Sequence, residues 1–330
     1  MEKYDPSGMY KVYDRWADIA NDAYNFNFVM FEEQDTKHVV FAGMGGSGTL
    51  GDIFSAILSK THLNVTVVKG YHLPNTVDSK TLVVTTSVSG NTPETLSVLR
   101  QAIKMKCQTI SFSSGGKIQD YCFKNNLPHY NIKEIHSPRA SLTVFLYSML
   151  KILKNFIPIS KNDVNESILE LKKLNEKISS RSMSKNNPSL SLAEWLTNNT
   201  MIYYPYGLQA VAIRFKNSLQ ENAKIFASAE DIVEASHNGI VSWERPSNFK
   251  PILIRGQDDY IKTKERWDII KEYFKNRHID CKEIVSIKGN ILSKIITLNY
   301  LLDYSTIYKA VLLKTNPTPV SSIDYIKKNL

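Results

Sequence analysis

The sequence contains few cysteines, and no pattern organises them. Only three occur, Cys107, Cys122 and Cys281, and no two form a Cys-x-x-Cys pair. A sparse, odd number of cysteines argues against a disulfide framework and against the usual zinc-ligand patterns. We therefore expect the chain to work in a reducing compartment, the cytoplasm.

Long apolar runs are also absent. Residues 1–18 are polar and lack the apolar core of a signal peptide. The longest apolar stretch, 141–153, contains Lys151 and is too short to span a bilayer. We therefore expect neither a secretory leader nor a membrane partner.

Basic clusters are missing as well, although the formal net charge is +9. The lysines are scattered, and the sequence has neither a basic arm nor an RNA-stacking motif, so a nucleic-acid partner is not expected. A net positive charge still favours an anionic ligand, and a phosphorylated metabolite fits a scattered lysine surface best.

Short apolar runs alternate along the chain with small-residue loops and helical segments. The runs predicted as strands are 38–42, 65–69, 81–85, 109–112 and 128–131, then 200–204, 251–255 and 281–286. Helices are expected at 10–31, 53–59, 96–105, 141–156, 169–180, 263–277 and 292–313, with a last helix after Pro319. Strands that alternate with helices predict doubly wound parallel α/β sheets. We expect two such units in tandem, at 1–157 and 158–330.

The loop 43–48, Gly-Met-Gly-Gly-Ser-Gly, follows the first strand and opens a helix. Glycines let the backbone approach a ligand closely, and the amides at a helix N-terminus attract an anion. The string satisfies the Gly-x-Gly-x-x-Gly pattern, but residues 64–69 lack the acidic residue that a dinucleotide site needs. No Gly-Lys-Ser/Thr follows, which excludes a P-loop. A tight strand–helix turn and an anion site both remain open from this loop alone.

A second loop, 85–92, lies between another strand and another helix and is rich in hydroxyl side chains. Those of Ser87, Ser89 and Thr92 are spaced so that they can converge. Pro93 and Glu94 suit the first turn of the helix that follows. Ligands of doubly wound sheets bind at the carboxyl ends of the strands, where both loops lie. Neutral donors in two adjacent loops predict a cradle for a phosphate monoester.

The motifs resemble those of a known family. Ser87–Thr95 resembles the phosphate loop of the sugar isomerase, or SIS, domain, and loop 43–48 resembles the first loop of the bifunctional phosphoglucose/phosphomannose isomerases. Four more segments resemble that family in the same order: 138–140, 218–224, 236–244 and 317–327. The resemblance implies two SIS-type subdomains within the phosphoglucose isomerase superfamily.

The resemblance implies an isomerase of glucose 6-phosphate, and of mannose 6-phosphate, to fructose 6-phosphate through a cis-enediol, without metal or cofactor. It makes Glu221 the base and His237 the ring-opening acid/base. By the same resemblance, Arg139 would stabilise the enediolate or hold the sugar oxygens, and Lys327 would contact a sugar hydroxyl or the ring oxygen. A shift of one residue in the match would put Lys328 in place of Lys327. The phosphate-binding residues would be Gly45, Gly46, Ser47, Ser87, Ser89 and Thr92.

The resemblance also implies a partner subunit. In the superfamily the histidine that matches His237 reaches into the active site of the other subunit, which implies a homodimer with shared sites. The sequence departs from the family pattern at Ser218, Gln220 and Ser242, and at Gly239, where the family usually has glutamate. A glycine there removes a carboxylate from the neighbourhood of His237.

Two other functions remain as alternatives. A non-catalytic SIS protein that senses a sugar phosphate needs only the phosphate loops, whereas this chain also retains Glu221, His237 and Lys327. Another SIS enzyme is the second alternative. An amidotransferase would be expected to carry a glutaminase domain with an N-terminal cysteine, and a hexulose-phosphate isomerase is usually a single short SIS domain.

Overall fold

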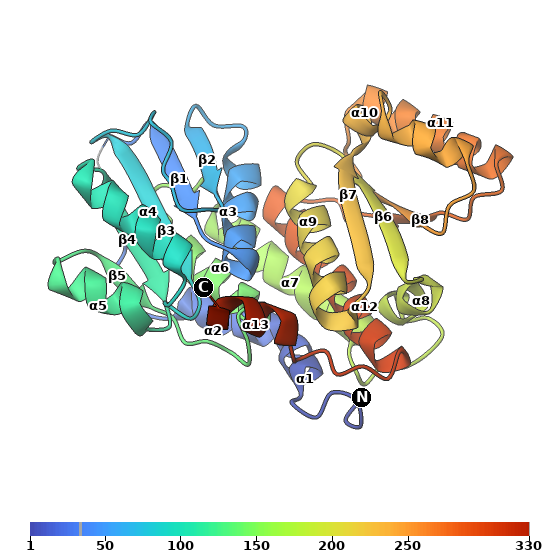
Figure 1. Cartoon of the computed structure of the whole chain (residues 1–330), viewed down its shortest axis with the longest axis horizontal. Helices are drawn as coiled ribbons and strands as arrows, with labels where there is room; N and C mark the ends of the chain where they lie inside the picture. The colour runs from blue at the N-terminus through green and yellow to red at the C-terminus, as the bar shows by residue number, and fades with distance from the viewer. Residues whose placement is uncertain (33–34, 330) are drawn as a thin grey trace. The chain divides into compact units, whose positions relative to one another are not determined.

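The computed structural model describes residues 1–32 and 35–329, and the chain divides into two compact units (Figure 1). The first, called here the N-terminal unit, comprises Arg15–Leu169 and Ile291–Ser293. The second, the C-terminal unit, comprises Met1–Asp14, Glu170–Asn290 and Lys294–Leu330. The domain bounds read from the sequence, 1–157 and 158–330, stay a prediction about which parts fold independently.

The N-terminal unit contains a five-stranded parallel sheet. Its strands are β1 (His38–Ala42), β2 (Asn64–Val68), β3 (Thr81–Ser87), β4 (Gln108–Ser113) and β5 (His129–Asn131). Their order is β2-β1-β3-β4-β5, and all neighbours are parallel. The chain reverses its direction of travel across the sheet between β1 and β3. The doubly wound fold is therefore confirmed, and its switch point lies between the two strands that precede the predicted phosphate loops.

Helices precede, connect or follow the strands of this unit. They are α2 (Trp16–Asn25), α3 (Gly45–Leu58), α4 (Pro93–Lys104), α5 (Gly116–Lys124), α6 (Leu142–Ile152) and α7 (Lys161–Ile178), within which the division between the units falls. Every residue of β1 and β3 is buried, as expected for a parallel sheet with both faces covered.

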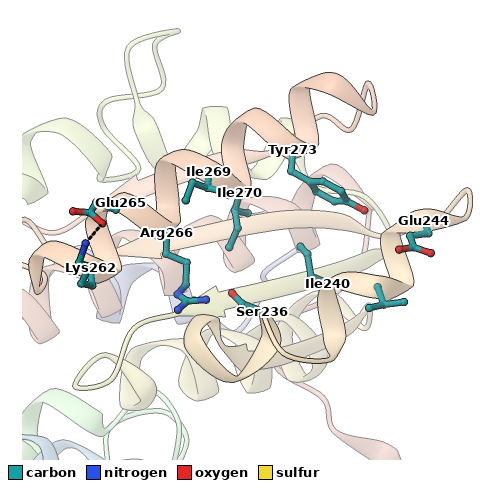
Figure 2. A pocket seen from close by; sticks show the side chains of 10 residues that line it. Ser236, Ile240, Glu244, Lys262, Glu265, Arg266, Ile269, Ile270 and Tyr273 are labelled. Carbon is teal, nitrogen blue, oxygen red and sulfur yellow. Dashed lines mark hydrogen bonds and ion pairs between the residues drawn. The ribbon is translucent and has the colours of Figure 1, made fainter.

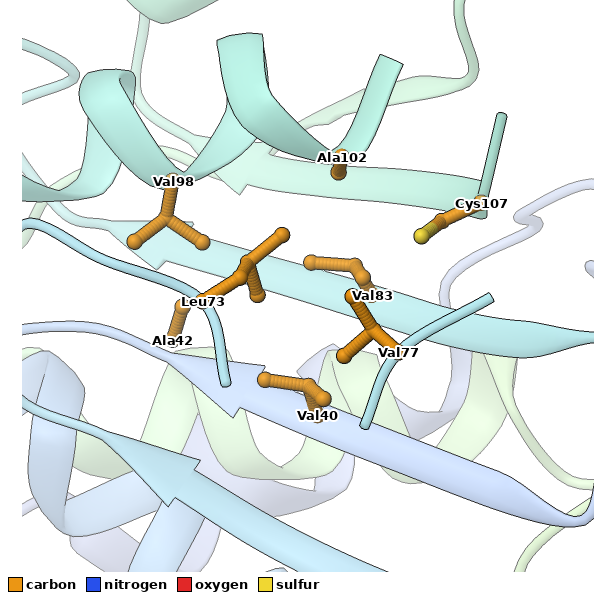
Figure 3. Packing of buried hydrophobic residues seen from close by; sticks show 8 residues of the cluster. All are labelled: Val40, Ala42, Leu73, Val77, Val83, Val98, Ala102 and Cys107. Atoms are coloured by element: carbon orange, nitrogen blue, oxygen red, sulfur yellow. The ribbon is translucent and has the colours of Figure 1, made fainter. Parts of the chain in front are cut away.

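One part of the core shows how the sequence produces this layering (Figure 3). Val40 and Ala42 alternate along β1 and so point to one face, which Val83 of β3 shares. Val98 and Ala102, four residues apart on α4, pack onto that face, and this cluster also includes Leu73, Val77 and Cys107. Apolar residues two apart on a strand and four apart on a helix each lie on one face, and here the two faces pack together in a single apolar cluster.

The C-terminal unit contains a four-stranded parallel sheet. Its strands are β6 (Asn199–Tyr204), β7 (Phe226–Asp231), β8 (Lys250–Arg255) and β9 (Lys282–Val285), in the order β7-β6-β8-β9. The sequence did not predict β7. This edge strand reads Phe-Ala-Ser-Ala-Glu-Asp, and only Ala227 is buried, so it lacks the apolar run that marked the other strands.

The helices of this unit are short except for two. They are α1 (Met9–Tyr13), α8 (Pro188–Trp195), α9 (Gln209–Ser218), the π-helix η1 (Leu219–Ala223), α10 (Ile232–Ala235), the 3₁₀-helix η2 (Gly239–Glu244), α11 (Ile261–Asn276), α12 (Ile291–Leu312) and α13 (Ser321–Asn329). In the described part of the chain, no helix combines the length and the apolarity that crossing a bilayer requires.

The predicted opening helix, 10–31, is wrong, because two helices occur there, α1 and α2. Asp14 lies at the break. Its carboxylate accepts hydrogen bonds from the hydroxyls of Ser180 (2.6 Å) and Tyr304 (2.6 Å) and from the Ser180 amide (2.9 Å). The anchored side chain fixes the chain at a turn that helical periodicity alone does not reveal.

Candidate active site

The first loop places glycines at the start of α3, directly after β1. Gly45 has φ +52°, and a Cβ built there would meet nothing within 4 Å. The N-cap residue, Met44, makes no side-chain hydrogen bond to the first turn. The N-terminus of α3 is therefore open to a ligand, and its backbone dipole favours an anion.

Two other positions of the loop need glycine for close packing. A Cβ on Gly43 would lie 2.8 Å from the carbonyl oxygen of Thr86. A Cβ on Gly46 would lie 3.3 Å from both the Cα of Arg139 and the carbonyl oxygen of Pro138. The absent side chains thus let β3 and the segment that carries the buried Arg139 approach the first loop.

Hydroxyl groups join the first loop to the second. The Oγ of Ser47 accepts a hydrogen bond from the backbone N–H of Val88, at 3.2 Å. The hydroxyls of Ser87 and Thr92 are hydrogen-bonded to each other, at 2.8 Å. Ser89 is exposed, and its Oγ accepts a hydrogen bond from the backbone N–H of Asn91, at 3.3 Å. The predicted phosphate-binding hydroxyls therefore belong to two loops that are connected at their base.

A third loop, after β4, supports the second. The amide of Ser114 donates to the carbonyl of Val88, and the amide of Ile118 donates to the carbonyl of Gly90, both at 2.9 Å. The loops at the carboxyl ends of β1, β3 and β4 are thus joined by backbone hydrogen bonds and by Ser47. We call this assembly, with Arg139 beside it, the phosphate cradle.

In the C-terminal unit, Glu221 lies in the middle of η1, the π-helical turn that continues α9. Side chains on both sides of it reach α12. The Ser218 hydroxyl donates to Asp303 Oδ1 (2.7 Å), and the side-chain amide of Asn222 donates to Thr306 Oγ1 (2.8 Å). Short π-helical turns occur often at functional sites, since they re-aim one side chain. We call this segment, 218–224, the Glu221 turn.

A buried ion pair fixes the helix that leads into the Glu221 turn. Arg214 of α9 contacts Asp303 through Nη2 (2.5 Å) and Nε (2.8 Å), and neither side chain is more than 2% exposed. Burial disfavours the charge on Arg214, but the Asp303 carboxylate outweighs it and holds the pKa of the guanidinium above its ordinary value. Neither Arg214 nor Asp303 was predicted from the sequence, because only the fold brings them together.

His237 lies in the exposed segment between α10 and η2, where its amide donates to the carbonyl of Glu234, at 2.9 Å. A Cβ on the nearby Gly239 would lie 2.3 Å from Glu230 Oε2. The Glu230 carboxylate of β7 therefore occupies the space where a side chain at 239 would begin. Burial, then Glu234 and Asp231, raise the pKa of Glu230. Glu230 was not predicted from the sequence, where Gly239 indicated only that the usual glutamate at position 239 is missing.

Lys327 and Lys328 are both exposed near the end of α13, a helix without buried residues. Lys327 stays the predicted site lysine. The segment before α13 contacts Lys224, whose Nζ donates to the carbonyls of Pro319 (2.7 Å) and Pro317 (3.4 Å). Lys224 ends the motif 218–224, but the sequence assigned it no role.

A pocket of about 470 Å³ lies between η2 and α11 (Figure 2). One wall includes Ser236, directly before His237, and Glu244, at the end of η2. The other wall includes Arg266 and Tyr273 of α11. None of the predicted site residues lines it. In the described residues, no group of three or more histidine, cysteine or acidic side chains is placed to hold a metal ion.

The structure thus groups the predicted residues by unit. Those of the N-terminal unit, which form the phosphate cradle, are Gly45, Gly46, Ser47, Ser87, Ser89, Thr92 and Arg139. Those of the C-terminal unit, with acid/base side chains, are Glu221, His237 and Lys327.

Comparison with known proteins shows the family of the chain. A bifunctional phosphoglucose/phosphomannose isomerase from Caldicellulosiruptor bescii is 31% identical over 314 residues, which cover 92% of each chain. The chain belongs to the bifunctional phosphoglucose/phosphomannose isomerase family. An isomerase of the same name from Aquifex aeolicus is 29% identical and covers 98% of this chain and 96% of its own.

Two further comparisons concern the C-terminal part of the chain and its fold. Residues 185–330 match the family described as the bacterial phospho-glucose isomerase C-terminal SIS domain. The fold is similar to the C-terminal domain of glucosamine-fructose-6-phosphate aminotransferase from Francisella tularensis, with a TM-score of 0.69. That likeness covers 93% of this chain and 96% of the other at 16% identity, so it shows the fold alone. The family and the SIS-type fold implied by the motifs are confirmed.

Proposed function

We propose that this protein is an aldose–ketose isomerase that interconverts glucose 6-phosphate and mannose 6-phosphate with fructose 6-phosphate. The observation that carries the proposal is the 31% identity to a bifunctional phosphoglucose/phosphomannose isomerase along 92% of both chains. The phosphate cradle supports it, because neutral hydroxyls and a helix N-terminus suit a phosphate monoester.

In this proposal the two sets of residues have different tasks. The phosphate cradle binds the phosphate at C6, so that the far end of the sugar is held in a fixed position. Glu221 takes the proton from C2 of the open-chain aldose and returns it to C1, while a proton moves from the C2 hydroxyl to the carbonyl oxygen at C1. Return of the proton to either face of C2 accounts for two epimeric aldoses.

Three other residues assist this transfer. Arg139 stabilises the negative charge that develops on the enediolate oxygens. His237 exchanges the proton needed to open the sugar ring, which suits an imidazole, whose ordinary pKa lies near neutrality. Lys327 contacts a sugar oxygen. Neither a metal nor an organic cofactor takes part in the proposed steps.

The decisive experiment is an isomerase assay of the purified protein with fructose 6-phosphate in EDTA, with separate detection of glucose 6-phosphate and mannose 6-phosphate. Glu221→Gln should lower kcat by about 100- to 10,000-fold and leave sugar-phosphate binding largely intact, because it removes a general base but no phosphate donor. As a matched variant, Ser47→Ala should mainly raise KM, by about tenfold, because it removes a hydroxyl from the cradle.

Each outcome distinguishes the alternatives. Wild-type protein that binds fructose 6-phosphate without converting it would support the sugar-phosphate sensor. A Glu221→Gln variant with full activity would show that another group is the base. Conversion to glucose 6-phosphate but not to mannose 6-phosphate would limit the enzyme to one aldose.

We also propose that the enzyme is a cytoplasmic homodimer in which His237 serves the site of the partner subunit. Mixing of two inactive variants, Glu221→Gln and His237→Ala, tests this arrangement. If the sites are shared, mixed dimers contain one site with both native residues, and activity should return to about a quarter of the wild-type value on statistical grounds. No recovery after subunit exchange would contradict shared sites.

A further inference from the structure

Lys224, at the end of the Glu221 turn, is hydrogen-bonded both to its own turn and to a segment about 95 residues later in the sequence. Its Nζ donates to the carbonyl of Glu221, three residues earlier, and to the carbonyl of Pro319 at 2.7 Å. A longer bond, at 3.4 Å, reaches the carbonyl of Pro317. An ammonium group has three N–H donors, which is enough for all three of these backbone carbonyls.

The backbone at Lys224 has an uncommon conformation for a lysine. Lys224 has φ +58°, in the left-handed region. Helices commonly end with glycine in this conformation, because other residues pay about 1 kcal/mol or more there. A lysine at this position keeps a strained backbone while its side chain holds three carbonyls.

The other end of this contact is a proline-rich segment. Pro317 and Pro319 have no backbone N–H to donate. The helix that follows, α13, has no buried residue, so apolar packing does not fix it. The Lys224 ammonium therefore links the Glu221 turn to the segment that leads into α13, the helix that carries Lys327.

We propose that Lys224 is a positioning residue that fixes the Glu221 turn and the Pro317–Pro319 segment relative to each other. Through these contacts it sets the orientation of the base, Glu221, and the location of the helix that carries Lys327. In these contacts Lys224 donates to backbone carbonyls and touches no reacting atom. The inference rests on the proposed function, since it takes Glu221 as the base.

Lys224→Met tests the inference, with Lys314→Met as its matched control. Lys314 is also exposed, also follows a helix and also has a left-handed backbone, with φ +56°. Loss of charge-assisted hydrogen bonds in Lys224→Met should lower kcat about tenfold or more, while KM for fructose 6-phosphate, set by the phosphate cradle, changes less than about twofold. Lys224→Arg, which keeps the charge and several donors, should recover a large part of kcat.

A second readout does not depend on activity. Digestion of the full-length protein with a carboxypeptidase, followed by mass spectrometry, should remove the residues of α13 several times faster from Lys224→Met than from the wild type or from Lys314→Met. Wild-type protein without isomerase activity would contradict the proposed function, whereas this digestion would still test the attachment of α13.

Two results would overturn the inference. One is equal kcat and equal digestion in Lys224→Met and Lys314→Met. The other is a loss of kcat that Lys224→Arg fails to recover although its thermal midpoint matches the wild type. If Lys224→Met does not fold, Lys224→Gln, which keeps a shorter donor, takes its place with the same expected pattern.

Discussion

The phosphate cradle and the Glu221 turn are built in different ways. In the cradle, glycine and hydroxyl residues stand directly at the ends of β1 and β3, and the bond from the Val88 amide to Ser47 Oγ joins one motif loop to the other. In the Glu221 turn, Ser218 and Asn222 depend on partners 85 and 84 residues away, on α12. The cradle residues can therefore be recognised in the sequence as a motif. The motif of the Glu221 turn includes Ser218 and Asn222 but not their partners on α12.

The two regions also differ in charge. The cradle offers neutral hydroxyls and the N-terminus of α3, with the cation Arg139 beside them and no acidic side chain among its predicted residues. The Glu221 turn rests on a buried ion pair between Arg214 and Asp303. A change in the cradle should therefore alter ligand binding first, and a change below the Glu221 turn should alter stability first.

The largest effect on stability is expected at Asp303. Asp303→Asn leaves the buried Arg214 without its counter-charge, and breaking a buried pair in this way costs about 3–5 kcal/mol. Urea unfolding should show a much lower midpoint than in the wild type. The control is Asp268→Asn, at an exposed aspartate of α11, which should leave the midpoint unchanged. An Asp303→Asn midpoint equal to the wild type would mean that the Glu221 turn does not depend on this pair.

Gly90 in the second cradle loop should give the next effect. It has φ +68°, and a Cβ would lie 1.7 Å from the carbonyl oxygen of Gly115. Gly90→Ala should therefore cost backbone strain plus about 1–3 kcal/mol for the forced movement of the neighbouring loop, and KM should rise.

Gly207→Ala separates the two costs of that substitution. Gly207 also has positive φ, +94°, but a Cβ there meets nothing within 4 Å, so only strain is expected. Equal losses of thermal midpoint in Gly90→Ala and Gly207→Ala would show that the cradle loop can move apart freely, contrary to the packing described here.

The smallest effect is expected at Glu230, beside Gly239. Because the folded state raises the pKa of Glu230 above its ordinary value, the folded state binds this proton more tightly than the unfolded state does. The group therefore lowers stability as the pH rises from the ordinary value through the folded pKa. Glu230→Gln should raise the thermal midpoint slightly at pH 7 and leave it unchanged below pH 4, where both states are protonated.

Glu272→Gln, at an exposed glutamate of α11, is the control for that comparison, and its midpoint should follow the wild type at both pH values. A Glu230→Gln midpoint that rises equally at both pH values would show that the carboxylate acts through packing against Gly239 rather than through its charge.

Local patterns predicted most of the fold. The run at 38–42 became β1 with the same bounds, since four apolar residues in succession after His38 are typical of a strand buried on both faces of a parallel sheet. The prediction failed where local pattern and tertiary contacts disagree. The opening helix breaks at Asp14, whose partners Ser180 and Tyr304 are far along the chain, and β7 pairs at the sheet edge with little apolar character.

The sequence by itself determined the two parallel sheets, the phosphate-loop motifs and the family, because strand–helix alternation and glycine–serine loops act over a few residues. Only the tertiary structure decided what surrounds those motifs: Asp303 under the Glu221 turn, Glu230 in the space left by Gly239, and Lys224 on the carbonyl of Pro319. These contacts join residues whose separation along the chain carries no local signal. Their geometry exists only once the chain has packed.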